Sequence, residues 1–237
     1  MIPLLIIFKF FAFCLSVFAS LKLRSSWKRN QPNEALFCFY RFFLFTSLVF
    51  LFFSLIPFIS FNLHLVQIFF YAVNIFTFIS TAYLAKIVLI FTYFKRLKDV
   101  VFKLTIFLTL IEFLVGIIYF KPASVFIYQY GGFNFILWGL NFPCWLMILH
   151  GLVMMLVGAL SVILFFKKGF SQKDSYLKIR YSFLGTGILF LLFAALSFYI
   201  FGAVISASLL KDFFHGTSSF LGLVFILTGI YYKKYLL

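Results

Sequence analysis

The sequence predicts an all-α polytopic membrane protein, a bundle of seven transmembrane helices that forms a single domain over residues 1–237. The first observation is composition: 65% of the residues are hydrophobic and 11% are charged, and the mean hydropathy is +1.15. Soluble domains do not have this composition. The second observation is that several apolar runs reach the roughly 20 residues that a helix needs to cross about 30 Å of hydrocarbon. Most of the charge lies between these runs, so we expect the lipid bilayer to be the solvent of the chain.

The expected spans follow the apolar runs and lie near residues 2–21, 36–60, 66–93, 100–120, 143–166, 179–205 and 216–232. The first run, MIPLLIIFKFFAFCLSVFAS, ends in small residues as a signal peptide does. It has no positive segment before it, and positive charge follows it instead. We therefore expect a retained first helix, whereas cleavage would leave six spans.

Lysine and arginine residues gather in alternate connections between the spans. They are frequent in residues 22–29, 95–103, 167–180 and 233–234, while Lys121 and Lys211 stand alone on the other side. Because cytoplasmic loops are enriched in positive charge, we expect the N-terminus outside and the C-terminus in the cytoplasm of a multi-pass protein of the bacterial inner (cytoplasmic) membrane. Orientation thus accounts for the net charge of +15, and no motif beside it predicts a nucleic-acid partner.

The longest connection on the outer side covers residues 121–142 and has the pattern of a β-hairpin. SVFIYQY precedes two glycines and FNFILWGL follows them, which predicts two short strands joined by a glycine turn. We expect this hairpin to form an external lid over the bundle, with these residues at its centre: Tyr128, Tyr130, Gly131, Gly132, Phe133 and Trp138. Its aromatic side chains either line a pocket or lie at the membrane interface, and the interface interpretation is favoured because Tyr and Trp are enriched there.

Glu112 is a carboxylate deep in an expected span, and Lys86 is its expected partner. A charged group costs about 2.5 to 3.5 kcal/mol in a membrane helix, so it needs a partner or neutralisation. Helices 66–93 and 100–120 would form a hairpin in which the two side chains differ in depth by about 4 to 5 Å, within reach of a lysine. A ligand- or proton-sensitive switch, a structural pair, and a Lys86 that extends to the interface beside a neutral Glu112 all remain open, with the structural readings favoured. Asn74 and His150 would extend the polar interior.

Motifs for catalysis, metals and cofactors are missing from the sequence. The three cysteines, Cys14, Cys38 and Cys144, are not paired in sequence, and no catalytic signature is present. The last expected span has no lysine, so retinal cannot bind there as a Schiff base in the usual place. We expect no enzyme activity, no cofactor and no metal site.

The segments QKDSYLKIRYSFLG and KDFFHGTSSFLGLVFILTGIYYKKYLL lead the sixth span and form the end of the chain. Their organisation resembles the N-terminal seven-transmembrane region of bacterial sensor histidine kinases, and the likeness in topology covers the whole chain. Asp212, Thr217 and the basic aromatic exit at residues 231–235 fall at matching places. The resemblance implies a sensor that couples an external or membrane signal to a cytoplasmic or membrane signalling partner.

Histidine positions mark a departure from that family. His64, His150 and His215 all fall on the outer side or in the outer membrane half, so none can serve as a cytoplasmic phosphoacceptor. We therefore expect a sensor-like module without a kinase, as a detached input module, a fragment of a longer protein or a solitary relative. The alternatives are a small transporter or permease subunit with a Lys86 and Glu112 polar interior, and a membrane scaffold or assembly subunit that binds anionic lipid through its cytoplasmic lysines.

Overall fold

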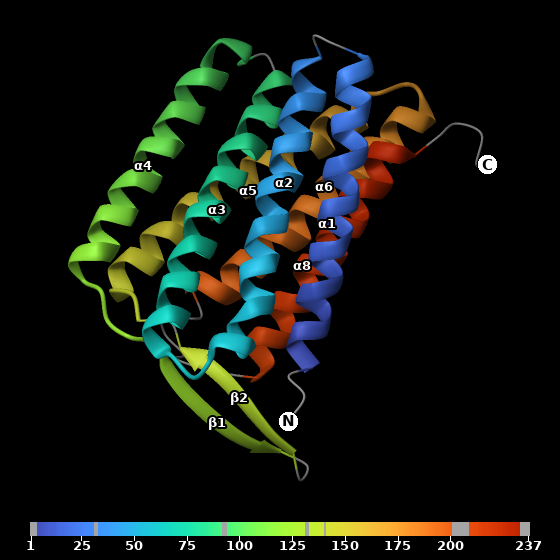
Figure 1. The fold of residues 1–237 in the computed structure, drawn as a ribbon. Helices are drawn as coiled ribbons and strands as arrows, with labels where there is room; N and C mark the ends of the chain where they lie inside the picture. Colours follow the sequence, from blue (N-terminus) through green and yellow to red (C-terminus); the bar gives the residue numbers. More distant parts are fainter. Residues whose placement is uncertain are drawn as a thin grey trace.

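The computed structural model describes residues 4–30, 33–91, 94–130, 133–139, 141–200 and 209–232. Within these residues the chain forms seven long helices and one pair of strands (Figure 1). The helices are α1 (Leu4–Arg29), α2 (Glu34–Leu55), α3 (Leu63–Ile90), α4 (Lys98–Ile118), α5 (Cys144–Phe170), α6 (Ser175–Ala195) and α8 (Leu209–Tyr231). The strands are β1 (Ser124–Tyr130) and β2 (Phe133–Gly139), which pair antiparallel from Ser124 with Gly139 to Tyr130 with Phe133.

Short polar side chains begin several of the helices. The side chain of Asn33 accepts a hydrogen bond from the backbone of Leu36, and that of Asp174 accepts one from Tyr176. Asn62 accepts from the backbone of both His64 and Leu65 at the start of α3. Such caps satisfy backbone N–H groups that have no partner within the helix, which explains why these helices begin where they do.

Three helix boundaries differ most from the sequence prediction. The predicted last span begins at residue 216, but α8 begins at Leu209. The predicted first span ends at residue 21, but α1 continues to Arg29, so the basic segment after the apolar run is itself helical. The predicted sixth span ends at residue 205, but α6 ends at Ala195 and continues as a π-helical turn, Leu196–Ile200. Residues 201–208 lie outside the described part of the chain. The wider π turn changes the direction in which the side chains after Ala195 point.

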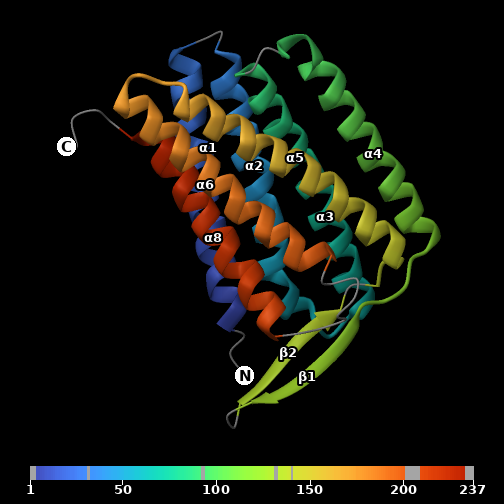
Figure 2. The same cartoon turned by 180° about the vertical axis from the view of Figure 1, so that it is seen from behind.

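The helices are arranged as a closed ring with one helix outside it. The contacts run α1–α2–α3–α5–α6–α8 and back to α1. α4 packs on α3 at the edge of the molecule, and both ribbon views show it displaced from the remaining helices (Figures 1 and 2). Much of α4 therefore faces lipid.

Six of the described helices are long and apolar enough to cross a membrane: α2, α3, α4, α5, α6 and α8. α1 is not among them, although its 26 residues run beside α2 and α8. The chain is therefore a multi-pass membrane protein.

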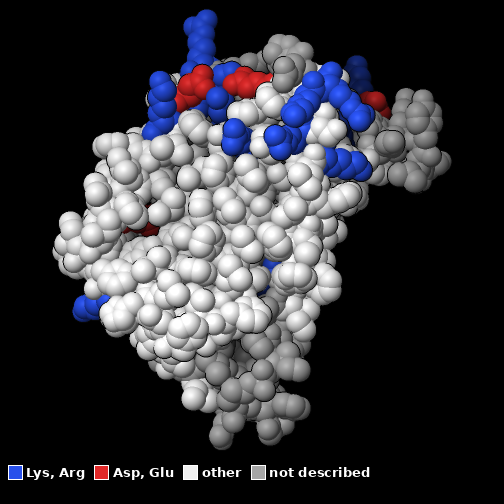
Figure 3. Space-filling model, viewed as in Figure 1, with Lys and Arg blue, Asp and Glu red and all other residues white. Residues whose placement is uncertain are grey.

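Charged side chains gather at one end of the bundle and leave an almost uncharged belt below (Figure 3). We call this end, where α1 meets α2, α3 meets α4 and α5 meets α6, the charged end. The opposite end, where the two strands lie, is called the hairpin end. The distribution is that of a protein whose middle is surrounded by hydrocarbon.

Glycines allow α6 and α8 to touch closely in the middle of the bundle. A Cβ on Gly187 would lie 2.7 Å from the carbonyl oxygen of Gly222 and 2.6 Å from Cγ1 of Ile226. A side chain at either glycine would therefore push the two helices apart. Small residues at helix contacts are characteristic of membrane bundles, because they permit close backbone approach.

The two strands are fixed to the start of α3 through Gln67 and Asn141. The fully buried Gln67 side chain donates to the Asn141 carbonyl at 3.1 Å and accepts from the Asn141 N–H at 3.2 Å. The Asn141 side chain in turn donates to the carbonyl of Pro122 and to the hydroxyl of Ser124. The Asn141 side chain thus links the segment that enters β1 to the segment that leaves β2.

Candidate functional site

The candidate site begins with Glu112 and His150, two ionisable residues buried between α4 and α5. Nδ1 of His150 lies 2.8 Å from Oε1 of Glu112, and the exposed fractions of the two residues are 1% and 8%. An ionised carboxylate can only accept, so Nδ1 carries the hydrogen in that bond whenever Glu112 is ionised. The contact is an ion pair when the imidazole is protonated and a charge-assisted hydrogen bond when it is neutral.

The His150 ring is held between two aromatic rings. Its centroid lies 3.8 Å from that of Phe78 on α3 and 3.8 Å from that of Tyr199 in the π-helical turn, and the Tyr199 ring is nearly parallel to it at 14°. The Tyr199 hydroxyl donates to Oδ1 of Asn74 at 2.9 Å. The ring of His150 is therefore in contact with two aromatic rings and is also bonded at Nδ1.

Together these residues form what we call the polar chain: Glu112, His150, Tyr199 and Asn74. It connects α4, α5, the π-helical turn and α3 through the interior of the bundle. Within the described residues, Nε2 of His150 is buried and has no hydrogen-bond partner. The polar chain thus presents one unused buried nitrogen.

Three of the four in-membrane residues singled out from the sequence belong to this chain, but Lys86 does not. Lys86 lies at the charged end, where its Nζ is 2.8 Å from Asp99 and 3.3 Å from Glu34. The expected pairing of Lys86 with Glu112 is therefore wrong. The depth estimate considered only α3 and α4 and ignored the two carboxylates within reach at the ends of α2 and α4.

Tyr199 is the member that sequence reasoning missed. It lies in an apolar run, FAALSFYI, in which a tyrosine is not distinguished from residues that face lipid or pack in the core. Its hydroxyl was the feature that could have indicated a polar contact, because a buried tyrosine O–H normally has a hydrogen-bond partner. Its position beside His150 depends on the π-helical turn, which no motif in the sequence predicts.

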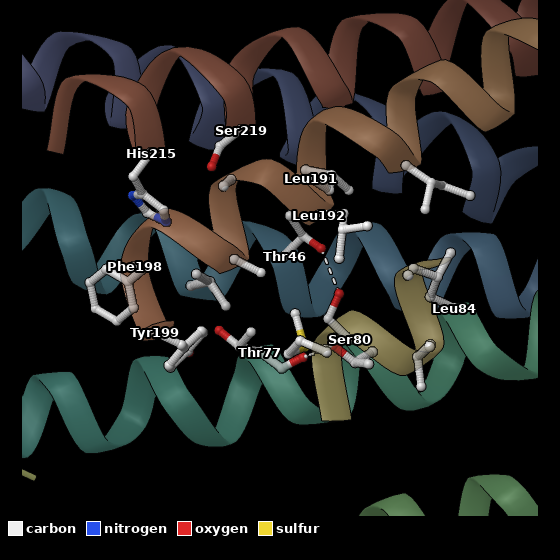
Figure 4. Close-up of a pocket in the computed structure, with 18 of the residues that line it drawn as sticks. Thr46, Thr77, Ser80, Leu84, Leu191, Leu192, Phe198, Tyr199, His215 and Ser219 are labelled. Atoms are coloured by element: carbon white, nitrogen blue, oxygen red, sulfur yellow. Dashed lines mark hydrogen bonds between the residues drawn. The ribbon is translucent and has the colours of Figure 1, made fainter. Parts of the chain in front are cut away.

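Beside the polar chain lies a central cavity of about 100 Å³. α2, α3, α5, α6, the π-helical turn and α8 all contribute to its wall, and Tyr199 belongs both to this wall and to the polar chain. Figure 4 shows His215 and Ser219 of α8 on one side of it and Thr46, Thr77 and Ser80 on the other. The remaining wall is largely aliphatic and aromatic.

Several hydroxyl groups in the cavity wall are hydrogen-bonded to one another or to backbone carbonyls. Thr46 and Ser80 share a hydrogen bond of 2.7 Å, drawn as a dashed line in Figure 4. Thr77 donates to the Val73 carbonyl at 2.7 Å. Each hydroxyl oxygen keeps a lone pair, so the wall can still accept a hydrogen bond from a small, mainly apolar molecule that carries one hydroxyl group.

Aromatic and basic residues form the wall of the cavity toward the hairpin end. The His215 ring lies 5.5 Å from the ring of Phe53 and 5.1 Å from that of Phe198. Nζ of Lys9 lies 4.3 Å above the Phe53 ring. The Lys9 ammonium group is therefore at a distance from the Phe53 ring that is typical of a cation–π contact.

The other predicted site residues are only partly placed. Gly131 and Gly132 lie outside the described residues, and the side chains of Tyr128, Tyr130 and Phe133 are not described. Trp138 packs against an apolar cluster that includes Phe198 and Tyr199. It is therefore the lid residue that the structure connects to the neighbourhood of the site.

Asp212 and Thr217, the residues matched to the sensor family, lie in the first turns of α8. The Thr217 hydroxyl donates to the Phe213 carbonyl of its own helix. Neither residue lines the central cavity, whose wall is reached from α8 by His215 and Ser219 instead.

Among the described residues, no three His, Cys, Asp or Glu side chains lie close enough to hold a metal ion. No protein-family model matches this chain, and no curated protein matches it in sequence. The resemblance to sensor histidine kinases stays a prediction, and function has to be argued from the polar chain and the cavity.

Proposed function

We propose that this protein is a non-enzymatic, sensor-like membrane module that takes up a small, mainly apolar ligand in the central cavity and transmits its presence to a cytoplasmic or membrane partner. The observation that carries the proposal is that the cavity wall includes both the π-helical turn and α8. π-Helical turns occur frequently at functional sites, since they interrupt an otherwise regular helix. A ligand here would touch the least regular element of the described bundle.

The proposed topology has seven spans, with α1 as the first, the N-terminus outside and the charged end in the cytoplasm. The support is the accumulation of lysine and arginine at one end of the molecule (Figure 3). The strand pair would then lie outside as a lid, and the protein would belong to the cytoplasmic membrane.

The route to the cytoplasmic face would be α8. At the cavity it contributes His215 and Ser219, and at its other end its last carbonyls are bound by Arg180 of α6, at 2.9 Å from Gly229 and 3.1 Å from Ile230. The Tyr176 hydroxyl also donates to the carbonyl of Tyr232. Because α6 and α8 are in contact at both levels, a displacement at the cavity reaches the end of α8, where the sensor family has its exit.

The ligand site can be tested with 4-fluorophenol, a compact aromatic probe with one hydroxyl. We expect a saturable, shifted ¹⁹F resonance for the protein in lipid nanodiscs. Ser219→Leu, which fills the cavity, should abolish it, and Thr228→Leu, on the exposed face of the same helix, should leave it unchanged. Equal signals from both variants would show partitioning into lipid and would contradict the proposal.

A second candidate function is transport, and the buried Glu112–His150 pair favours it. Ionisable groups inside membrane helices commonly serve ion or proton pathways. Transport predicts that proteoliposomes containing the protein are permeable to protons and that Glu112→Gln abolishes this flux. The sensor proposal predicts no protein-dependent flux in either case.

A further inference from the structure

The surface between α3 and α4 holds a second hollow, separate from the central cavity. It has a volume of about 510 Å³ and is lined by Ile75, Ile79, Phe102, Lys103, Ile106, Phe107, Thr109, Leu110 and Phe113. We call it the membrane groove. Phe107 and Leu110 in its wall are more than half exposed, at 57% and 55%, so the groove is open to the surrounding bilayer.

Apart from Lys103, the groove presents essentially only carbon. The single hydroxyl in its wall, that of Thr109, donates to the Thr105 carbonyl at 2.8 Å and is buried. An occupant therefore needs an apolar chain without hydrogen-bonding groups along this length.

The dimensions of the groove match one leaflet. From Phe102 to Phe113 the helix rises by roughly 16 Å, and one half of a hydrocarbon core of about 30 Å is about 15 Å thick. An acyl chain anchored at the charged end would thus run along the groove to the middle of the membrane.

Lys103 lies at the end of the groove nearest the charged end, about 7 to 8 Å along α4 from its first residue. Its neighbours Lys86 and Lys98 are occupied: Lys86 binds Asp99 and Glu34, and Lys98 binds Glu34. Within the described chain, no carboxylate lies within ion-pair distance of Lys103, which is exposed. Its ammonium group is therefore available to a phosphate at headgroup depth.

We propose that the membrane groove is a binding site for a phospholipid with an anionic headgroup, whose acyl chain lies between α3 and α4 and whose phosphate binds Lys103. The proposal does not depend on the function of the central cavity. A bound acyl chain would fill the hollow between α3 and α4.

Native mass spectrometry in mild detergent tests the site, with phosphatidylglycerol and phosphatidylcholine as probes. We expect the protein to retain phosphatidylglycerol preferentially. Lys103→Gln should weaken that retention about fivefold, the equivalent of about 1 kcal/mol per surface lysine, without changing retention of phosphatidylcholine. Lys173→Gln removes the same charge from an exposed site elsewhere at the charged end and should have little effect.

Ile106→Trp fills the groove and should reduce retention of both lipids, whereas Leu114→Trp, on an exposed part of α4 outside the groove, should not. Ile79→Phe is a milder filling variant for use if Ile106→Trp does not fold. Equal losses from Lys103→Gln and Lys173→Gln, or undiminished retention in the filled variants, would overturn the proposal. A dimer that becomes monomeric on filling the groove, with lipid retention unchanged, would show a second copy as the occupant and would also overturn it.

Discussion

The charged end and the middle of the bundle both contain ionisable side chains, but these side chains are at least partly exposed at the charged end and buried in the middle. At the charged end, Lys86 lies between Glu34 and Asp99, and both carboxylates are substantially exposed at 40% and 58% of their side chains. In the interior, Glu112 and His150 are almost fully buried and depend on each other. Water and salt can replace a lost partner at the charged end but not in the interior.

This difference predicts different roles for the two regions. Exposed ion pairs contribute little free energy each, so we expect the charged end to influence orientation in the membrane without fixing the geometry of the bundle. The interior pair needs a fixed geometry to be tolerated, and Tyr199, one of the two aromatic rings in contact with His150, also forms part of the wall of the central cavity. Mutations in the two regions should therefore differ in their effects.

The largest effect is expected from His150→Leu, which leaves Glu112 buried without its partner. Removing one member of a buried pair destabilises by about 3 kcal/mol or more. Unfolding in lipid bicelles, measured by steric trapping, would report the loss. His64→Leu, at an exposed histidine near the hairpin end, is the matched control and should be nearly neutral. Equal stabilities of the two variants would remove the distinction between the regions.

The close contact of α6 and α8 gives the next effect. Gly187→Ala places a Cβ within 2.8 Å of three atoms of α8 and should destabilise by about 2 kcal/mol, because the helices must separate. Gly216→Ala on α8 meets only Cβ of Phe8 at 3.5 Å, and it should be neutral or slightly stabilising because alanine favours helix more than glycine does. Thermal unfolding in nanodiscs distinguishes the two. An unchanged unfolding temperature for Gly187→Ala would mean that the two helices are not in close contact at Gly187.

Tyr199→Phe removes one hydroxyl from the polar chain and keeps the ring stacked on His150. We expect a loss of about 1 kcal/mol, since Asn74 loses its donor in an apolar environment. The double variant Tyr199→Phe with Asn74→Leu should be less destabilised than the sum of the single variants. Strict additivity would contradict the hydrogen bond between the two side chains.

The smallest effect is expected at the charged end. Lys86→Met removes two ion pairs and should change the free energy of unfolding by no more than about 1 kcal/mol, with the difference shrinking in high salt. The effect should be measured at low and high salt concentration. A loss as large as that from His150→Leu would show that the ion pairs at the charged end are as critical as the buried pair.

The helical bundle was predictable because hydrophobic length and charge-rich connections report directly on a membrane environment. Glu112, Asn74 and His150 were also recognisable, since polar residues in apolar runs are rare and need partners. Their pairing was not, because partners were sought only on helices adjacent in sequence, and Lys86 proved to have two carboxylates within reach at the charged end. The position of Tyr199 could not be predicted because it depends on the π-helical turn, and that turn depends on packing and not on a local sequence motif. The central cavity depends on how six parts of the chain meet, and no single segment encodes it.

Hydrogen exchange at the C-terminal end of α8 tests most directly whether the central cavity communicates with that end. Backbone exchange over residues 225–232 would be followed by mass spectrometry with and without 4-fluorophenol, in the wild-type protein and in the Ser219→Leu and Thr228→Leu variants. The account predicts a change in exchange with the wild type and Thr228→Leu and none with Ser219→Leu. Probe binding in the cavity with no change in exchange at these residues would contradict the transmission of a signal along α8.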